Sequence, residues 1–240
     1  MRTLAIIPAR GGSKRIPGKN SRAFAGLPLV SWSIRFARAM PRFTTVLVST
    51  DDPDVARIAA EEGLPVPFMR PADIAGDKAS SVSVARHALD FEAAAGRHYD
   101  LVALLQPTSP VRLIERWEEA YALLENDRID SVVGVAPVSS HPYHAYSRTE
   151  AGALVPFVAG GDELRKLRSQ DLPEAFCLAG NLYLTRTPVL MGLNTFFPPQ
   201  TAGVVCDEPF ESMDIDTEVD WVVAETLTRH YGQQAWPRSL

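Results

Sequence analysis

Four cationic side chains stand close together near the start of the chain, in a segment that also holds two adjacent glycines. The cations are Arg10, Lys14, Arg15 and Lys19. Gly11 and Gly12 let the backbone approach a ligand closely and adopt a positive φ. The chain as a whole is acidic, with 24 Lys and Arg against 29 Asp and Glu and a formal charge of −5. Since the overall charge would repel an anion, a local cluster of this kind predicts a cradle for polyphosphate, unless it is a solvated basic loop.

Two common phosphate-binding motifs do not fit this segment. Gly18 and Lys19 look like the end of a P-loop, G-x-x-x-x-G-K-[ST], but Ser13 stands where the first glycine is required and Asn20 replaces the Ser or Thr. Pro17 also removes a backbone N–H from the part that should be rich in amides. A G-x-G-x-x-G fingerprint is absent as well, so the segment predicts a phosphate site of another kind.

Two carboxylates flank Ile215 near the end of the chain. In an extended segment Asp214 and Asp216 share one face, while Ile215 points the other way, toward the core. Carboxylates this close repel each other unless a cation lies between them. The alternative is that Asp214 caps a turn and that Asp216 supports the start of the last helix, whose dipole favours anions. The residues alone leave both interpretations open.

The elements that must position these groups alternate along the chain. Continuous apolar runs predict buried strands at 4–9, 46–50, 101–105 and 131–138. Helical periodicity predicts helices at 28–40, 53–62, 81–95 and 113–126. This alternation is typical of an α/β, Rossmann-like doubly wound fold with a mostly parallel sheet. The loops that follow the strands then meet at one edge, where such folds bind ligands.

The alternation fails at residues 139–176, which are rich in turn residues. We expect a projecting, hairpin-rich insertion there, within one domain spanning residues 1–240. Its apolar residues include Tyr143, Tyr146, Leu154 and Phe157. A hairpin alone is marginal in water, so this insertion predicts a dimerisation arm that pairs with a second copy of the chain.

Two further strands and one helix follow the insertion. The strands are expected at 181–185 and 202–206, and the helix opens at Thr217 with Asp220 in the place of a capping-box Glu. We expect its inward face to carry Val219, Val222, Val223 and Leu227, and Gly232 to end it.

Composition bounds the class of protein. With 240 residues, 46% hydrophobic and 22% charged, the chain is typical of a soluble globular domain. The acidic balance disfavours nucleic-acid partners. Two cysteines without Cys-x-x-Cys spacing suit a reducing cytoplasm, and no run reaches the roughly 20 apolar residues of a membrane span. We therefore expect a cytoplasmic protein without membrane partners.

Arg10 to Asn20 resembles the signature of the acylneuraminate cytidylyltransferases, the CMP-sialic acid synthetase family. The resemblance continues, in family order, in Leu104–Arg112, Arg168–Pro173 and Asp214–Glu218. It implies a nucleotide-diphospho-sugar transferase type of fold. It also implies a Mg²⁺-dependent enzyme that joins CTP to a nine-carbon 2-keto acid sugar, an acylneuraminate-type nonulosonic acid. The anomeric hydroxyl would attack the α-phosphate in line and release pyrophosphate.

The same resemblance implies roles for individual residues. The implied nucleotide-binding residues are Arg10, Ser13, Lys19, Asn20, Arg70, Ala79 and Ser81. Catalysis would fall to Arg10, Lys19 and Asp216, with Asp214 and Asp216 holding the metal. The implied sugar contacts are Gln106, Arg165, Arg168 and Asn181, the two arginines meeting the sugar carboxylate from across a dimer interface.

Other functions remain open at this point. The chain reads Ala179-Gly180-Asn181 where sialate enzymes commonly read Asn-Gly-Ala, so the acceptor is open among neuraminate, legionaminate and pseudaminate, with Kdo as a more distant alternative. A nucleotide-sensing binding protein is the non-enzyme alternative. Intact Lys19 and Asp216 favour the enzyme, and pyrophosphate release from CTP would distinguish the two.

Overall fold

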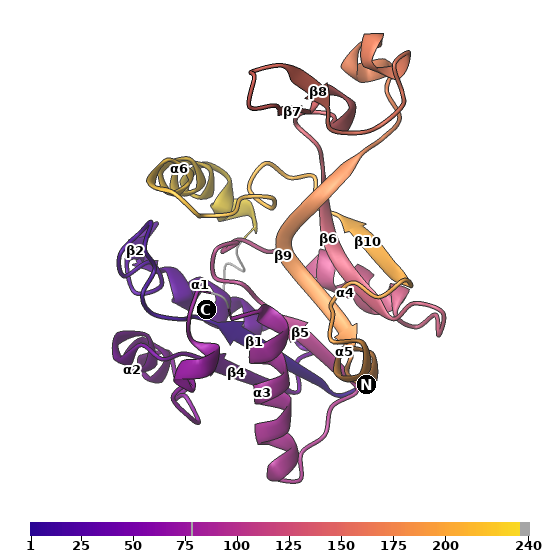
Figure 1. Ribbon diagram of the computed structural model, residues 1–240. Coiled ribbons are helices and arrows are strands. Elements are labelled where there is room, and N and C mark those ends of the chain that lie inside the picture. The colour runs from indigo at the N-terminus through magenta and orange to yellow at the C-terminus, as the bar shows by residue number, and fades with distance from the viewer. Residues whose placement is uncertain (78, 236–240) are drawn as a thin grey trace.

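A six-stranded sheet forms the centre of the protein in the computed structural model, which describes residues 1–77 and 79–235 (Figure 1). The strands are β1 (Thr3–Pro8), β4 (Thr45–Ser49), β5 (Leu101–Leu104), β6 (Ser131–Pro137), β9 (Phe176–Arg186) and β10 (Thr201–Val205). Their order is β10-β6-β9-β5-β1-β4. Only β9, among the described strands of this sheet, runs antiparallel to its neighbours. The predicted mostly parallel sheet is confirmed.

Helices cover both faces of this sheet. One face packs against α1 (Leu29–Ala39), α2 (Pro53–Glu61) and α4 (Ile114–Leu123). The other packs against α3 (Ser81–Ala94) and α5 (Thr187–Leu193), the latter not predicted from the sequence. Alternate residues of β1 divide between the two cores, with Ile7 on the first side and Ile6 on the second. Because both faces are covered, these strands are continuously apolar in sequence.

The helix boundaries lie close to the predicted ones. The Asp52 side chain caps α2 and accepts a hydrogen bond from the Asp54 N–H at 2.9 Å. Pro28 is the residue before α1 rather than its first residue, and it belongs to β3 (Leu27–Pro28), which pairs with β2 (Ala23–Phe24). The helical periodicity that predicted α1 corresponds to its buried face, since Trp32, Phe36 and the following Met40 are all buried.

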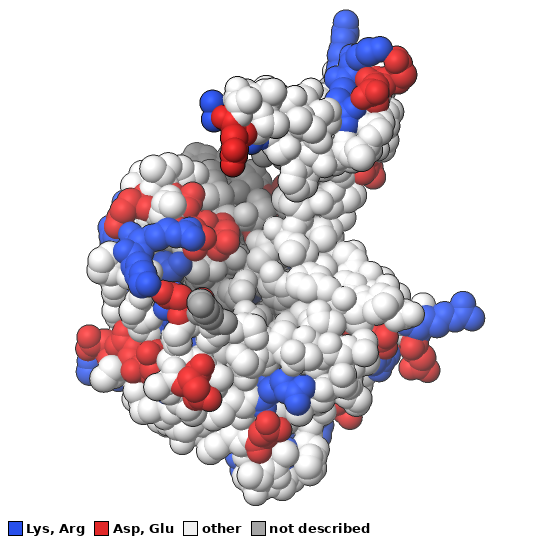
Figure 2. Space-filling view, in the orientation of Figure 1, with Lys and Arg blue, Asp and Glu red and all other residues white. Residues whose placement is uncertain are grey.

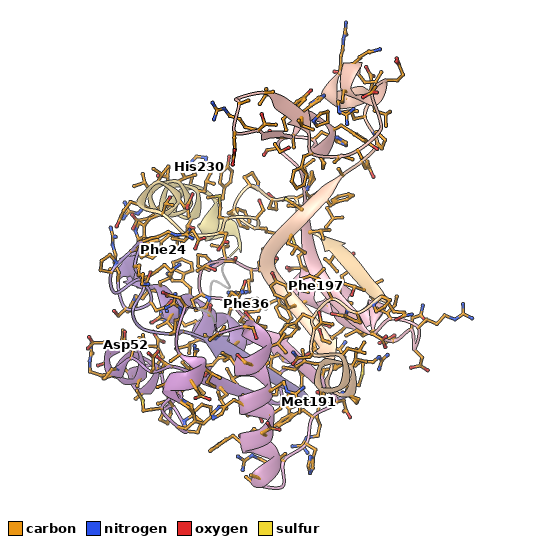
Figure 3. All side chains as sticks on the ribbon, viewed as in Figure 1. Phe24, Phe36, Asp52, Met191, Phe197 and His230 are labelled. Carbon is orange, nitrogen blue, oxygen red and sulfur yellow. The ribbon has the colours of Figure 1, made fainter. Side chains whose placement is uncertain are left out.

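On the last helix, α6 (Glu218–Ala235), the predicted inward residue Leu227 packs against the core, whereas the three predicted valines are exposed. Val219 and Val222 are 72% and 61% exposed, whereas Trp221 and Ala224 are buried. Trp221 packs edge-on against Phe24, with ring centroids 5.5 Å apart; Phe24 is labelled in Figure 3. An indole offers more apolar area than any single valine and packs here against another aromatic ring, so burying it decides how the helix is rotated. The helix also continues past Gly232, where we expected it to end.

Residues between β6 and β9 project from the sheet, as Figure 1 shows. They contain one hairpin in the described chain, β7 (Tyr146–Arg148) with β8 (Leu154–Pro156). Three short 3-10 helices accompany it, η2 (Pro142–His144), η3 (Leu164–Lys166) and η4 (Ser169–Asp171). The outer parts of β6 and β9 continue into this region and stay paired, with Pro137 opposite Phe176. We call residues 138–178 the arm.

The remaining short element is η1 (Ala72–Ile74), between β4 and α3. No helix in the described part of the chain is long and apolar enough to cross a membrane.

Candidate active site

One pocket at the carboxyl edge of the sheet gathers residues from four separate segments. The seven residues that we expected to bind a nucleotide all line it, and so does Gln106. Four more lining residues were not predicted: Pro8, Val84, Pro107 and Thr108. Pro8 ends β1, Val84 lies in the first turn of α3, and Pro107 and Thr108 follow β5. The topology of the sheet is therefore enough to bring them here.

The phosphate loop after β1 is held by the loop after β4. The Gly11 N–H donates to Asp51 Oδ1 at 2.8 Å. A Cβ added to Gly11 would lie 3.2 Å from Asp52 Cβ, so a larger residue would push the two loops apart. Gly12 has a φ of +64°, which L side chains rarely adopt. The double glycine is therefore required by the path of the loop.

Lys19 connects the phosphate loop to the segment before α6. Its side chain is only 13% exposed, and its Nζ donates to the Ile215 carbonyl oxygen at 2.8 Å. Asp216 Oδ1 lies 3.5 Å from the same nitrogen, and Asp216 Oδ2 accepts from Arg15 at 2.9 Å. The predicted phosphate cation and the predicted metal ligand thus lie side by side.

Asn20 is buried at the pocket wall, 7% exposed. Its Nδ2 donates to the Arg10 carbonyl oxygen at 2.9 Å. Its Oδ1 is buried and has no hydrogen-bond partner in the described part of the chain. A buried acceptor without a partner is costly, so a ligand hydroxyl at this point would stabilise the site.

Arg70 is also buried and lies beside Ser49, at the end of β4. Its Nε donates to Ser49 Oγ at 3.0 Å, and its Nη2 donates to the Ser49 carbonyl oxygen. Burial lowers the pKa of Arg70, and the nearby charge of Arg10 acts in the same direction. The guanidinium therefore forms a fixed, polar wall on this side of the pocket.

The loop after β5 is organised around Arg112, a residue to which the sequence reasoning gave no role. Its side chain is fully buried, and it donates to the carbonyl oxygens of Gln106 (2.6 Å) and Asn181 (2.9 Å) and to Ser33 Oγ (3.1 Å). These acceptors are neutral, and burial lowers the pKa of Arg112 to about 9. Arg112 thereby fixes the backbone from which the Gln106 side chain enters the pocket.

The segment before α6 has no strand, although it was predicted to be strand-like. Ile215 is nevertheless fully buried as expected, and its N–H donates to the Thr108 carbonyl oxygen at 2.8 Å. The predicted capping box is confirmed. The Thr217 N–H donates to Asp220 Oδ2 at 2.7 Å, and the Asp220 N–H donates back to Thr217 Oγ1 at 3.3 Å.

A buried ion pair holds the other end of this segment. Glu211 is fully buried and accepts from Arg116 of α4 at 3.2–3.4 Å. Burial raises the pKa of Glu211, and Arg116 opposes that shift. Removing one partner of such a pair would leave an uncompensated buried charge.

The carboxylates suit a divalent cation only if a ligand adds further oxygens. No group of three or more His, Cys, Asp or Glu that could hold a metal ion occurs in residues 1–77 and 79–235. Asp214 is exposed, and Asp216 is about half exposed at the mouth of the site. Magnesium commonly binds through one or two carboxylates together with substrate phosphates. The donor set therefore fits Mg²⁺ that arrives with a polyphosphate.

The four expected sugar contacts lie in three different places. Gln106 lines the pocket. Asn181 does not; it is 2% exposed, and its Oδ1 lies 3.5 Å from Cys206 Sγ in the interior. Our expectation that its side chain faces the sugar is therefore corrected. The bulge in β9 near Gly180, whose φ is +80°, turns the amide inward.

Arg165 and Arg168 belong to the arm, which projects from the body of the protein in Figure 1. The Arg165 guanidinium donates to Asp162 at 2.5 Å and to the Val158 carbonyl oxygen. Within this protomer the arm does not bring either arginine to the residues that line the pocket.

Two residues beside the site carried no usable sequence signal. Asp77 lies 3.0 Å from Arg10 and 2.5 Å from Lys14. Tyr183 is nearly buried, and burial together with the charge of Asp214 raises its pKa. A single carboxylate in a loop, or a tyrosine in an apolar strand, has no sequence pattern that distinguishes it, and only the fold shows that it lies beside the site.

Comparison with known proteins gives the following matches. A family model described as "Cytidylyltransferase" matches residues 4–149. The CMP-N,N'-diacetyllegionaminic acid synthase of Legionella pneumophila is 35% identical over 95% of this chain and 96% of its own. The N-acylneuraminate cytidylyltransferase of Oncorhynchus mykiss is 31% identical over 95% of this chain and 50% of its own.

The fold also matches a solved structure. A CMP:2-keto-3-deoxy-manno-octonic acid synthetase complexed with CTP aligns over 96% of this chain and 99% of its own, with a TM-score of 0.68 and 17% identity. At that identity the likeness shows the fold, a mostly parallel sheet between helices.

Proposed function

Because the chain belongs to the cytidylyltransferase family, we propose that it transfers the cytidylyl group of CTP to a nonulosonic acid and releases pyrophosphate. The protein is a nucleotidyltransferase enzyme, as the family and the named relatives indicate. One observation carries the proposal: a single pocket holds the cations Arg10 and Lys19, the buried acceptor of Asn20, and Gln106, with Asp216 beside Lys19.

The nucleoside end of CTP suits the wall formed by Asn20, Arg70 and Ala79. A ribose hydroxyl would donate to Asn20 Oδ1, which lacks a partner in the described residues. Arg70, fixed by Ser49, and the backbone near Ala79 would read the edge of the cytosine ring. A purine is larger, and we expect this wall to exclude it.

The phosphate end suits the cationic loop. Negative charge gathers on the pyrophosphate as the bond to the α-phosphorus breaks, so Arg10 and Lys19 would stabilise the transition state more than the ground state. Ser13 and Ser81 line the same pocket and would donate hydroxyl hydrogen bonds to phosphate oxygens. Positioning and charge neutralisation are the main contributions that a protein makes to such a transfer.

Asp214 and Asp216 would hold a Mg²⁺ ion that accompanies the triphosphate. When bound, the ion supplies charge neutralisation at the phosphate and lowers the pKa of a coordinated hydroxyl. The chain's own contribution is to present Asp216 beside Lys19, on a segment held by the Thr217–Asp220 box and by Ile215 in the core.

The acceptor would enter beside Gln106, with its anomeric hydroxyl directed at the α-phosphate. We propose an N-acylated nine-carbon acid of the legionaminate or neuraminate type. The legionaminate relative, which matches almost the whole of both chains, supports this choice over Kdo. Pseudaminate remains the next alternative.

We further propose that the enzyme is a homodimer joined through the arm. Phe157 and Leu154 are 76% and 65% exposed, and Leu178 is 53% exposed. Figure 2 shows few Lys, Arg, Asp or Glu side chains on the visible surface where the arm joins the rest of the protein. Such a surface suits a second copy of itself, and Arg165 or Arg168 would then reach the partner's sugar pocket.

A panel assay tests the reaction. Pyrophosphate release should require CTP together with a nonulosonic acid, and it should be fastest with legionaminate or neuraminate. Comparable rates with ATP would contradict the cytidylyl assignment. CTP binding without pyrophosphate release from any acceptor would instead support a nucleotide sensor.

A further inference from the structure

Asp77 bridges two cations at the outer part of the cationic loop. Its two carboxylate oxygens contact two different cations of the phosphate loop, Arg10 Nη2 at 3.0 Å and Lys14 Nζ at 2.5 Å. Together with Arg15, Lys19 and Asp216 they surround a second hollow, which shares Arg10, Ser13 and Lys19 with the nucleotide pocket. The cradle is thus closed by a carboxylate of the protein itself.

A carboxylate and a phosphate make the same kind of charge-assisted hydrogen bond to an arginine or a lysine. Lys14 lines the second hollow but not the nucleotide pocket, so a ligand must extend from the pocket into the second hollow to reach it. A polyphosphate that takes the Arg10 Nη2 and Lys14 Nζ donors now given to Asp77 therefore competes with that carboxylate. A monophosphate held within the nucleotide pocket does not reach Lys14. Lys14 and Arg10 also lower the pKa of Asp77, because both cations favour its ionised form.

We propose that Asp77 is an affinity-determining residue that competes with the outer phosphates for Arg10 and Lys14. The inference rests on the proposed function and adds a role for a residue outside the nucleotide pocket. As pyrophosphate leaves, the Asp77 carboxylate takes its place between the two cations. The competition weakens the binding of pyrophosphate and so favours its departure after the transfer.

Asp77→Asn removes the charge and keeps the shape, and Asp77 is exposed, so the variant should fold normally. Titration calorimetry with pyrophosphate, CTP and CMP gives the readout. Two exposed ion pairs are lost from the free enzyme, so we expect pyrophosphate and CTP to bind roughly three- to tenfold more tightly. The affinity for CMP should stay the same, and pyrophosphate should inhibit turnover more strongly.

Asp73→Asn is the matched control. Asp73 lies in η1, in the same stretch of chain, and lines neither of the two hollows. The substitution removes the same charge as Asp77→Asn. It should leave all three affinities unchanged.

Three results would overturn the role of Asp77: unchanged or weaker pyrophosphate binding in Asp77→Asn, an equal gain for CMP, or an equal gain in Asp73→Asn. If the unaltered protein binds neither CTP nor pyrophosphate, the proposed function fails as well. Normal binding by the unaltered protein without a gain in Asp77→Asn refutes the competition alone.

Discussion

Asp216 shares its carboxylate between Arg15, at 2.9 Å, and Lys19, at 3.5 Å, at the point where the proposed triphosphate and metal meet. We expect Asp216→Ala to lower turnover by roughly 10²–10³-fold, because it removes a ligand of the ion that neutralises phosphate charge. Asp214→Ala should lose nearly as much, and excess EDTA should abolish the activity of the unaltered enzyme. Steady-state rates at saturating CTP and sugar measure all three.

The control for this experiment is Asp127→Ala. Asp127 is fully exposed and precedes β6, at the opposite edge of the sheet. It should keep its activity. Near-normal rates for both site variants, or full activity in EDTA, would show that the two aspartates serve the structure alone.

At the scale of the element, the first turn of α6 ties helix stability to the placement of Asp216. The Thr217–Asp220 box satisfies N–H groups that the helix leaves free, and Asp220 Oδ2 also accepts from the Asp216 N–H at 3.2 Å. Thr217→Ala should therefore lower the free energy of unfolding by about 1 kcal/mol and lower kcat as well. Denaturant titration and kinetics measure these effects.

Thr226→Ala is the control on the same helix. Its hydroxyl donates to the Val222 carbonyl oxygen at 2.7 Å, inside the helix, so its loss should leave kcat unchanged. Because Ala favours a helix more than Thr does, the free energy of unfolding should stay the same or rise by a few tenths of a kcal/mol. The pH dependence of the free energy of unfolding gives a further test of the Thr217–Asp220 box. The Thr217 hydroxyl is the main cause of the lowered pKa of Asp220, so the box stabilises above the ordinary Asp pKa of about 4 and is lost as the pH falls below it. If the difference in the free energy of unfolding between the unaltered protein and Thr217→Ala grew at low pH, that result would contradict this origin.

The elements show where sequence reasoning succeeds and where it stops. The buried strands were predictable because apolar runs mark them, and the topology of a doubly wound sheet places the loops that follow at one edge. The individual pocket residues were expected from the family resemblance and not from the topology. The direction of β9 was not predictable, since an apolar run carries no direction. The inward face of α6 was misjudged because three valines and Trp221 are all hydrophobic, and the sequence does not say which of them will be buried. Trp221 is the buried one because it packs against Phe24. The orientation of the Asn181 side chain was misjudged because the bulge in β9 interrupts the regular alternation of side chains along the strand.

At the scale of the whole molecule, the arm exposes several large apolar side chains, among them Phe157, Leu154 and Leu178. We expect light scattering at micromolar concentration to give a dimer, and Phe157→Glu to give a monomer, because an interface cannot bury an unpaired charge at a residue now 76% exposed. Leu193→Glu places the same charge at an exposed leucine that ends α5, away from the arm, and should stay dimeric. A monomeric unaltered protein would remove the arm's proposed role.

The central position of β9 also governs the order in which the sheet can be completed during synthesis. β9 lies between β5 and β6, yet it follows both of them in the chain, after the whole arm. Until the ribosome has released residue 186, β5 and β6 each present an edge of unpaired N–H and C=O groups, and such edges invite aggregation. The nascent chain therefore stays vulnerable until β9 has followed the whole arm out of the ribosome, and the strand that then enters the middle of the sheet joins its two halves.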